Sequence, residues 1–154
     1  MKSEHINPFI EGTVQTFETM CGIKPVRSGK LQLVNSESTT SNGLLGIIGL
    51  SGDLKGAVII SMEEDLASDI VGRFIGEKVE GIEDLTDGFG EILNIIAGAA
   101  AAKLTGNVNL ALPTVLLGEK NQLPATKLRP WVIIPMTFPE VGKFDIKVSL
   151  EDRN

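Results

Sequence analysis

Residues 87–94 have the sequence Asp87-Gly-Phe-Gly-Glu91-Ile-Leu-Asn94 and lie inside a stretch with the periodicity of a buried helix. At about 100° per residue, Glu91 lies about 40° from Asp87 and Asn94 about 20° to its other side, so the three polar side chains share one narrow stripe. The apolar residues of the stretch gather on the opposite side: Phe89, Ile92, Leu93, Ile96 and Ala100. We therefore predict a long helix over 83–105 that buries its apolar side and presents the polar stripe to solvent.

Small residues extend this polar stripe. Gly98 and Ala101 continue it, and Gly90 borders it. Glycine costs roughly 1 kcal/mol in a helix relative to alanine, so helix stability does not explain the choice. We interpret the stripe as a face that a partner approaches closely. Two alternatives stay open: Glu91 and Asn94 could be ordinary solvated side chains, and Gly98 could be small because another part of the chain or a dimer mate crosses there.

The segments on either side of this helix predict the fold. Extended segments are predicted over 25–35, 43–50, 54–62, 108–117, 131–138 and 144–150. Two further helices are predicted, from Asn7-Pro8 to Gly22 and from a capping box at Ser61 and Glu64 to Gly76. The resulting order of elements is helix, three strands and helix, followed by helix and three strands. It predicts an α+β fold in a single domain over 1–154, with two pseudo-repeated α-β-β-β halves and an antiparallel sheet.

Composition limits the class of protein. The chain has 154 residues, of which 42% are hydrophobic and 22% charged, which fits one soluble domain with a substantial core. The net charge of −6 gives no basic surface for nucleic acid or anionic lipid, so a partner should be neutral or cationic at the contact. No signal peptide is expected, and the longest apolar run is far shorter than the roughly 20 residues of a membrane span. With Cys21 as the one cysteine, we expect a cytoplasmic protein.

The spacing Asp-x-x-x-Glu-x-x-Asn on a helix, with Pro113 in the next extended segment, resembles the signature of the CheC/CheX/FliY family of chemotaxis response-regulator phosphatases. The segment Gly52-Asp-Leu-Lys-Gly56-Ala-Val-Ile-Ile-Ser-Met62, followed by an acidic helix start, is also similar to that family. The resemblance covers nearly the whole chain. One complete motif in a chain of this length is most similar to the CheX branch.

The resemblance implies an enzyme that hydrolyses the aspartyl-phosphate of a CheY-like receiver domain. In this role Asn94 would orient the attacking water, and Glu91 would pair with the active-site lysine of the receiver. Asp87 would orient the helix start and could contact the receiver, while Gly90, Gly98 and Ala101 would form the face on which the receiver docks. Phosphoryl transfer suits these residue types, because its loose transition state needs positioning and charge neutralisation more than a strong base.

The resemblance also bears on cofactors and partners. No metal site is expected in this chain, so the required Mg²⁺ would belong to the receiver. A homodimer is expected from the family. The main alternative is a non-catalytic module of the same fold that binds a receiver or a flagellar switch protein; a small-ligand-binding α/β domain has no supporting motif.

A comparison of the two halves predicts one site in the chain. Asn7-x-x-x-Glu11-x-x-Val14 on the first helix repeats the spacing of the motif, but Val14 stands where Asn94 stands. Without the carboxamide the first half could not orient water. The alternative is that Glu11 is a solvated helix residue whose spacing matches by accident.

Overall fold

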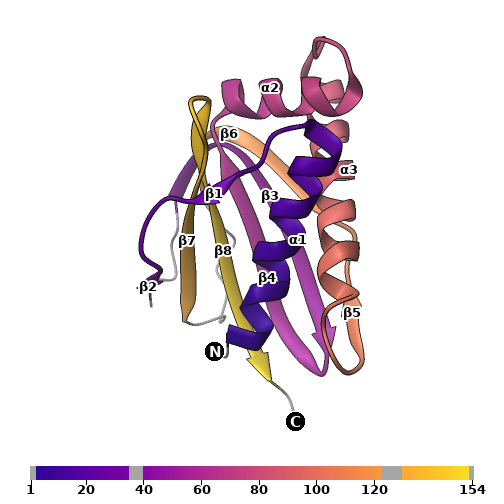
Figure 1. Cartoon of the computed structure of the whole chain (residues 1–154), viewed down its shortest axis with the longest axis vertical. Coiled ribbons are helices and arrows are strands. Elements are labelled where there is room, and N and C mark those ends of the chain that lie inside the picture. The colour runs from indigo at the N-terminus through magenta and orange to yellow at the C-terminus, as the bar shows by residue number, and fades with distance from the viewer. Residues whose placement is uncertain (1–2, 35–39, 123–129, 153–154) are drawn as a thin grey trace.

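One antiparallel sheet forms the frame of the protein in the computed structural model, which describes residues 3–34, 40–122 and 130–152 (Figure 1). The elements, in chain order, are α1 (Ser3–Cys21), β1 (Val26–Arg27), β2 (Gln32–Val34), β3 (Thr40–Gly52), β4 (Leu54–Met62), α2 (Glu64–Ile75), α3 (Ile82–Ala101), β5 (Val108–Leu110), β6 (Thr114–Gln122), β7 (Trp131–Phe138) and β8 (Gly142–Asp152). α1 and α3 lie side by side on one face of the sheet, and α2 crosses its end.

The strand order shows the two halves. The main path of the sheet is β1-β7-β8-β4-β3-β5, with β2 also pairing β7 and β6 also pairing β3. If β1 and β2 are exchanged with β5 and β6, β3 with β7, and β4 with β8, the result is the same strand order read from the opposite edge of the sheet. The central pair β4 and β8 comes from different halves, and Val58 faces Val148 near its middle. The predicted α+β fold with an antiparallel sheet is therefore confirmed, and the topology has the predicted twofold repeat.

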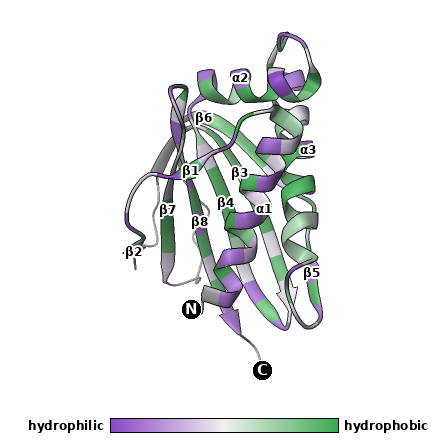
Figure 2. Cartoon of the chain, viewed as in Figure 1, coloured by the Kyte–Doolittle hydropathy of each residue, from purple (hydrophilic) through white to green (hydrophobic). Residues whose placement is uncertain are grey.

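The helix α3 packs on the sheet through the side that the periodicity assigned to the core. Phe89, Ile92, Leu93, Ile96 and Ala100 are all buried. Gly46 of β3 makes room for Phe89 and Leu93, because a Cβ atom there would lie 2.9 Å from the ring of Phe89 and closer still to Leu93. Figure 2 shows hydrophobic strands behind α1, whose visible outer side carries hydrophilic residues. The helix layer and this face of the sheet form the main core.

The boundaries of the first two helices differ from the prediction. α1 begins at Ser3, so Asn7 is not its N-cap and Pro8 lies inside it. The additional first turn of α1 is packed against the core through Ile6, which is buried. The predicted capping box is wrong as well, because Ser61 belongs to β4 and α2 begins at Glu64 without a side-chain cap. Each helix ends as predicted, before a glycine with positive φ, at Gly22 and Gly76.

The second half also departs from the prediction in its boundaries. α3 ends at Ala101 and not at the predicted residue 105, and Gly106 lies in a turn with φ of 90°. That turn is held by Asp53, whose Oδ2 accepts a 2.8 Å hydrogen bond from the backbone N–H of Asn107. The predicted strand 108–117 is two strands, and the second of them, β6, continues beyond residue 117 to Gln122. No helix in the described residues is long and apolar enough to cross a membrane.

Candidate functional site

The helix α3 carries all six residues that the sequence singled out. Asp87, Glu91, Asn94 and Gly98 are exposed, while Gly90 and Ala101 are half-buried. Their exposure follows from the burial of the opposite side of the helix, which fixes how α3 is rotated on the sheet. The structure therefore brings the predicted residues together on one accessible face.

A groove of about 570 Å³ runs between this face and the segment that joins β5 to β6. Its lining residues are Thr86, Asp87, Gly90, Glu91 and Asn94 from α3, with Leu112, Pro113 and Val115 opposite. Pro113 thus lies across the groove from the polar stripe, although it is 19 residues beyond Asn94 in the chain. Gly98 and Ala101 continue the stripe beyond the residues that line the groove.

A β-bulge shapes the wall opposite α3. Leu110 pairs with Leu50 and Thr114 pairs with Ile47, so the three residues 111–113 stand opposite only two residues of β3. Such a bulge bends its strand and redirects side chains, and Pro113 is tolerated there because the residue needs no ladder N–H. Pro113 was predicted from the sequence as part of the motif, whereas Leu112, Val115 and Thr86 were missed. A proline that interrupts an apolar extended segment was the available signal in the sequence for these residues.

The polar side chains of the stripe are not engaged elsewhere. Within the described part of the chain, no hydrogen bond or ion pair involves the side chains of Asp87, Glu91 or Asn94. Glu11, which has the corresponding spacing on α1, accepts a 3.1 Å hydrogen bond from Lys103 Nζ. Glu91 and Asn94 are therefore free to contact a partner, whereas Glu11 is already paired within the chain.

The glycines of α3 lie in different surroundings, so their small size has different structural consequences. A Cβ atom at Gly88 would lie 2.5 Å from Val71 Cγ1, so this glycine allows α2 to pack on α3. At Gly90 the nearest atom, Val115 Cγ2, would be 3.8 Å away, and at Gly98 nothing lies within 4 Å. The idea that another described part of this chain crosses at Gly98 is therefore wrong. That a partner or a second copy of the chain approaches Gly98 stays a prediction.

The charge of the groove restricts what it can hold. Two carboxylates, Asp87 and Glu91, line it, and none of its lining residues is basic. Across the described residues, no group of three or more His, Cys, Asp or Glu side chains is placed to hold a metal ion. An anionic group could therefore enter this groove only with cations that the partner supplies.

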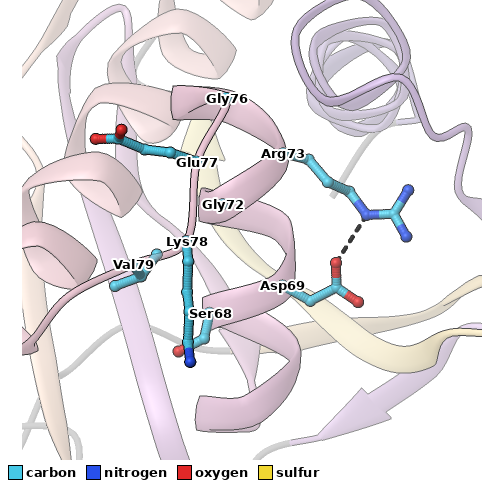
Figure 3. Close-up of a pocket in the computed structure, with 8 residues that line it drawn as sticks. All are labelled: Ser68, Asp69, Gly72, Arg73, Gly76, Glu77, Lys78 and Val79. Carbon is cyan, nitrogen blue, oxygen red and sulfur yellow. Dashed lines mark hydrogen bonds and ion pairs between the residues drawn. The ribbon is translucent and has the colours of Figure 1, made fainter.

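A second depression lies along α2 and the segment after it (Figure 3). Its lining mixes both charge signs, and Arg73 Nε donates a 2.8 Å hydrogen bond to Asp69 Oδ1. In Figure 3 Arg73 and Asp69 lie on one side of α2, while Lys78 runs along the other side toward Ser68. These side chains do not converge on one point, so this depression is a weaker candidate for a site than the groove at α3.

Comparisons with known proteins show what the chain is similar to. The family model described as "Chemotaxis phosphatase CheX" matches residues 44–137, which include α3 and the bulge. A protein of Thermotoga maritima named CheY-P phosphatase CheX is 28% identical over 98% of both chains. A CheC-like superfamily protein from a Shewanella species shares 28% identity and a TM-score of 0.84, covering 98% of this chain and 99% of that one. The CheX of the CheX-CheY-BeF3-Mg²⁺ complex from Borrelia burgdorferi has the same fold, with a TM-score of 0.79, 21% identity and coverage of 96% and 98%.

Proposed function

The chain belongs to the chemotaxis phosphatase CheX family, and we propose that it hydrolyses the aspartyl-phosphate of a CheY-like response-regulator receiver domain, which ends the signal carried by that receiver. The observation that carries the proposal is the pair Glu91 and Asn94. Both side chains are exposed on one face of α3, line one groove and have no side-chain partner within the described chain.

Asn94 is the residue proposed to position the water. Its carboxamide oxygen can accept a hydrogen bond from the attacking water and hold that water in line with the phosphorus. A carboxylate at this position would set a full negative charge against the phosphoryl oxygens, whereas the amide is neutral. Attack by the water oxygen breaks the bond between phosphorus and the aspartate oxygen. The products are inorganic phosphate and the free carboxylate of the receiver.

Glu91 is the residue proposed to orient the receiver. Its carboxylate would repel a phosphoryl group unless a cation stood between them, and the groove offers no cation of its own. The active-site lysine of the receiver is the proposed partner, and a salt bridge to it would fix the approach of the two proteins. Asp87 lies one turn earlier on the same face and adds to the negative charge that this lysine meets.

The Mg²⁺ needed for the reaction is proposed to be bound by the receiver. Bound there, the ion would neutralise charge that develops on the phosphoryl oxygens. The residues of this chain would therefore position water and partner, and the phosphorylated receiver would arrive with its metal.

The rival function is a receiver-binding or flagellar-switch-binding module without catalysis. An exposed Asn94 beside Glu91 disfavours it, because docking alone does not need a neutral water ligand at that position. To separate the two functions, we would measure phosphate release from a phosphorylated CheY-like receiver with and without this chain, and its affinity for the beryllofluoride-activated receiver. Faster release supports the phosphatase, whereas tight binding with unchanged release supports the module.

A homodimer and a cytoplasmic location complete the proposal. The dimer is proposed because the family resemblance implies one. Light scattering at micromolar concentration should give twice the mass of the chain, and a monomer mass would remove the dimer from the proposal. The cytoplasm is proposed because the substrate is an intracellular receiver domain.

A further inference from the structure

We propose that Leu112 is a docking residue for the phosphorylated receiver, so that its side chain sets the affinity for the substrate without taking part in hydrolysis. This inference rests on the proposed function, since the receiver is the occupant of the groove. It adds an apolar contact to a site that the sequence motif describes only through polar and small residues.

The exposure of Leu112 is the first observation. Its side chain is 84% exposed, the highest value among the large hydrophobic residues that the structure describes. Single exposed leucines are common on protein surfaces, so exposure alone assigns no role. The position of this leucine is more informative, because it lines the same groove as Glu91 and Asn94.

The β-bulge is the second observation. The backbone on both sides of the bulge is tied to β3: the N–H of Ala111 donates a 2.9 Å hydrogen bond to the carbonyl of Gly49, and Thr114 pairs with Ile47. Between these anchors Pro113 fixes its own φ and restricts the backbone of Leu112. The leucine is thus held outward by a short and stiff segment, which lowers the entropy lost when a partner covers it.

The residues on the two walls of the groove together indicate which kind of partner fits it. One wall carries Asp87 and Glu91, and the facing wall is apolar, formed by Leu112, Pro113 and Val115. A partner that fits must bring a cation toward α3 and an apolar side chain toward the bulge. A receiver that delivers its phosphoryl group and lysine to Asn94 and Glu91 enters this groove and must therefore cover Leu112.

The test compares Leu112→Ser with Leu33→Ser, a change at another exposed leucine. Leu33 is 69% exposed on β2, near the opposite edge of the sheet. For Leu112→Ser we expect KM for the phosphorylated receiver, and Kd for the beryllofluoride-activated receiver, to rise about 10-fold, with kcat within about twofold of wild type. Leu33→Ser should leave KM and Kd unchanged. Leu112→Met should keep most of the wild-type affinity.

The outcomes separate this inference from the proposed function. Equal Kd values for Leu112→Ser and wild type, with both proteins folded by thermal melting, would overturn the docking role. A fall in kcat at unchanged KM would also overturn it, because the residue would then act on the chemical step. A wild-type chain that binds the activated receiver but releases no phosphate would remove the proposed function, while the Kd values would still decide the role of Leu112.

Discussion

Replacing Gly98 with lysine should block docking of the receiver while leaving the fold intact or more stable. Gly98 is exposed on α3, one turn beyond Asn94, and a Cβ atom there would meet no described atom within 4 Å. The Cβ atom of the new side chain therefore encounters no steric resistance within the described protein. It does occupy the proposed docking face of the receiver, and its positive charge would repel the lysine of the receiver.

The magnitude follows from the position in the helix. Glycine is about 1 kcal/mol less favourable than alanine in a helix interior, and lysine is close to alanine. The free energy of unfolding should rise by roughly 0.5–1 kcal/mol, which is an increase in Tm of about 1–4 °C for a chain of this size. Affinity for the activated receiver should fall at least 10-fold, or about 1.4 kcal/mol, because two surfaces can no longer come into close contact.

Thermal melting, light scattering and receiver titration together make the assay. Gly98→Ala is the matched control on the same site and should gain stability with little loss of affinity. Gly88→Ala is the contrasting control: its Cβ would lie 2.5 Å from Val71 Cγ1, so overpacking should destabilise the fold by about 1–3 kcal/mol. A stable Gly98→Lys protein that binds the activated receiver normally would refute the reasoning. Loss of a wild-type dimer in this variant would instead assign Gly98 to the dimer contact.

Two further predictions concern charged and titratable groups. Glu91→Gln should weaken receiver binding and turnover together, since a charge pair across the interface disappears. Glu11→Gln should leave both within about twofold, because Glu11 pairs with Lys103 within the chain. Steady-state phosphate release measured on both variants decides this. Burial raises the pKa of Cys21 to about 11, from an ordinary value of 9.0, so the folded protein at pH 8 should have about 100-fold less thiolate than the unfolded chain. Alkylation by iodoacetamide should slow accordingly and accelerate in denaturant, and equal rates in both states would contradict the burial of this thiol.

The sequence predicted the features of this protein that depend on local periodicity. The stripe of α3 follows from residues within two turns of one helix, so the burial of Phe89 and the exposure of Glu91 and Asn94 could be predicted without a partner segment. Helix ends at Gly22 and Gly76 are equally local, because a positive φ favours glycine. The antiparallel sheet followed from the number and spacing of apolar segments.

Features that depend on distant segments were missed. The bulge at Leu112 exists only in the register between β3 and β5/β6, and that register is set by residues more than 60 positions earlier in the chain. The structural reason for Gly88 was missed because nothing nearby in the sequence indicates that Val71 packs on it. The same holds for the ion pair between Glu11 and Lys103, which links α1 to the turn after α3 at a separation of 92 residues.

The most direct test of the central claim is the turnover of Asn94→Ala on a phosphorylated CheY-like receiver. Asn94 is exposed and its side chain contacts no partner in the described chain, so the variant should fold and dock as wild type does. Loss of the water ligand should lower kcat for phosphate release by roughly 100-fold, with KM within about twofold of wild type. A variant that keeps near-wild-type kcat while folded would show that Asn94 does not position the water.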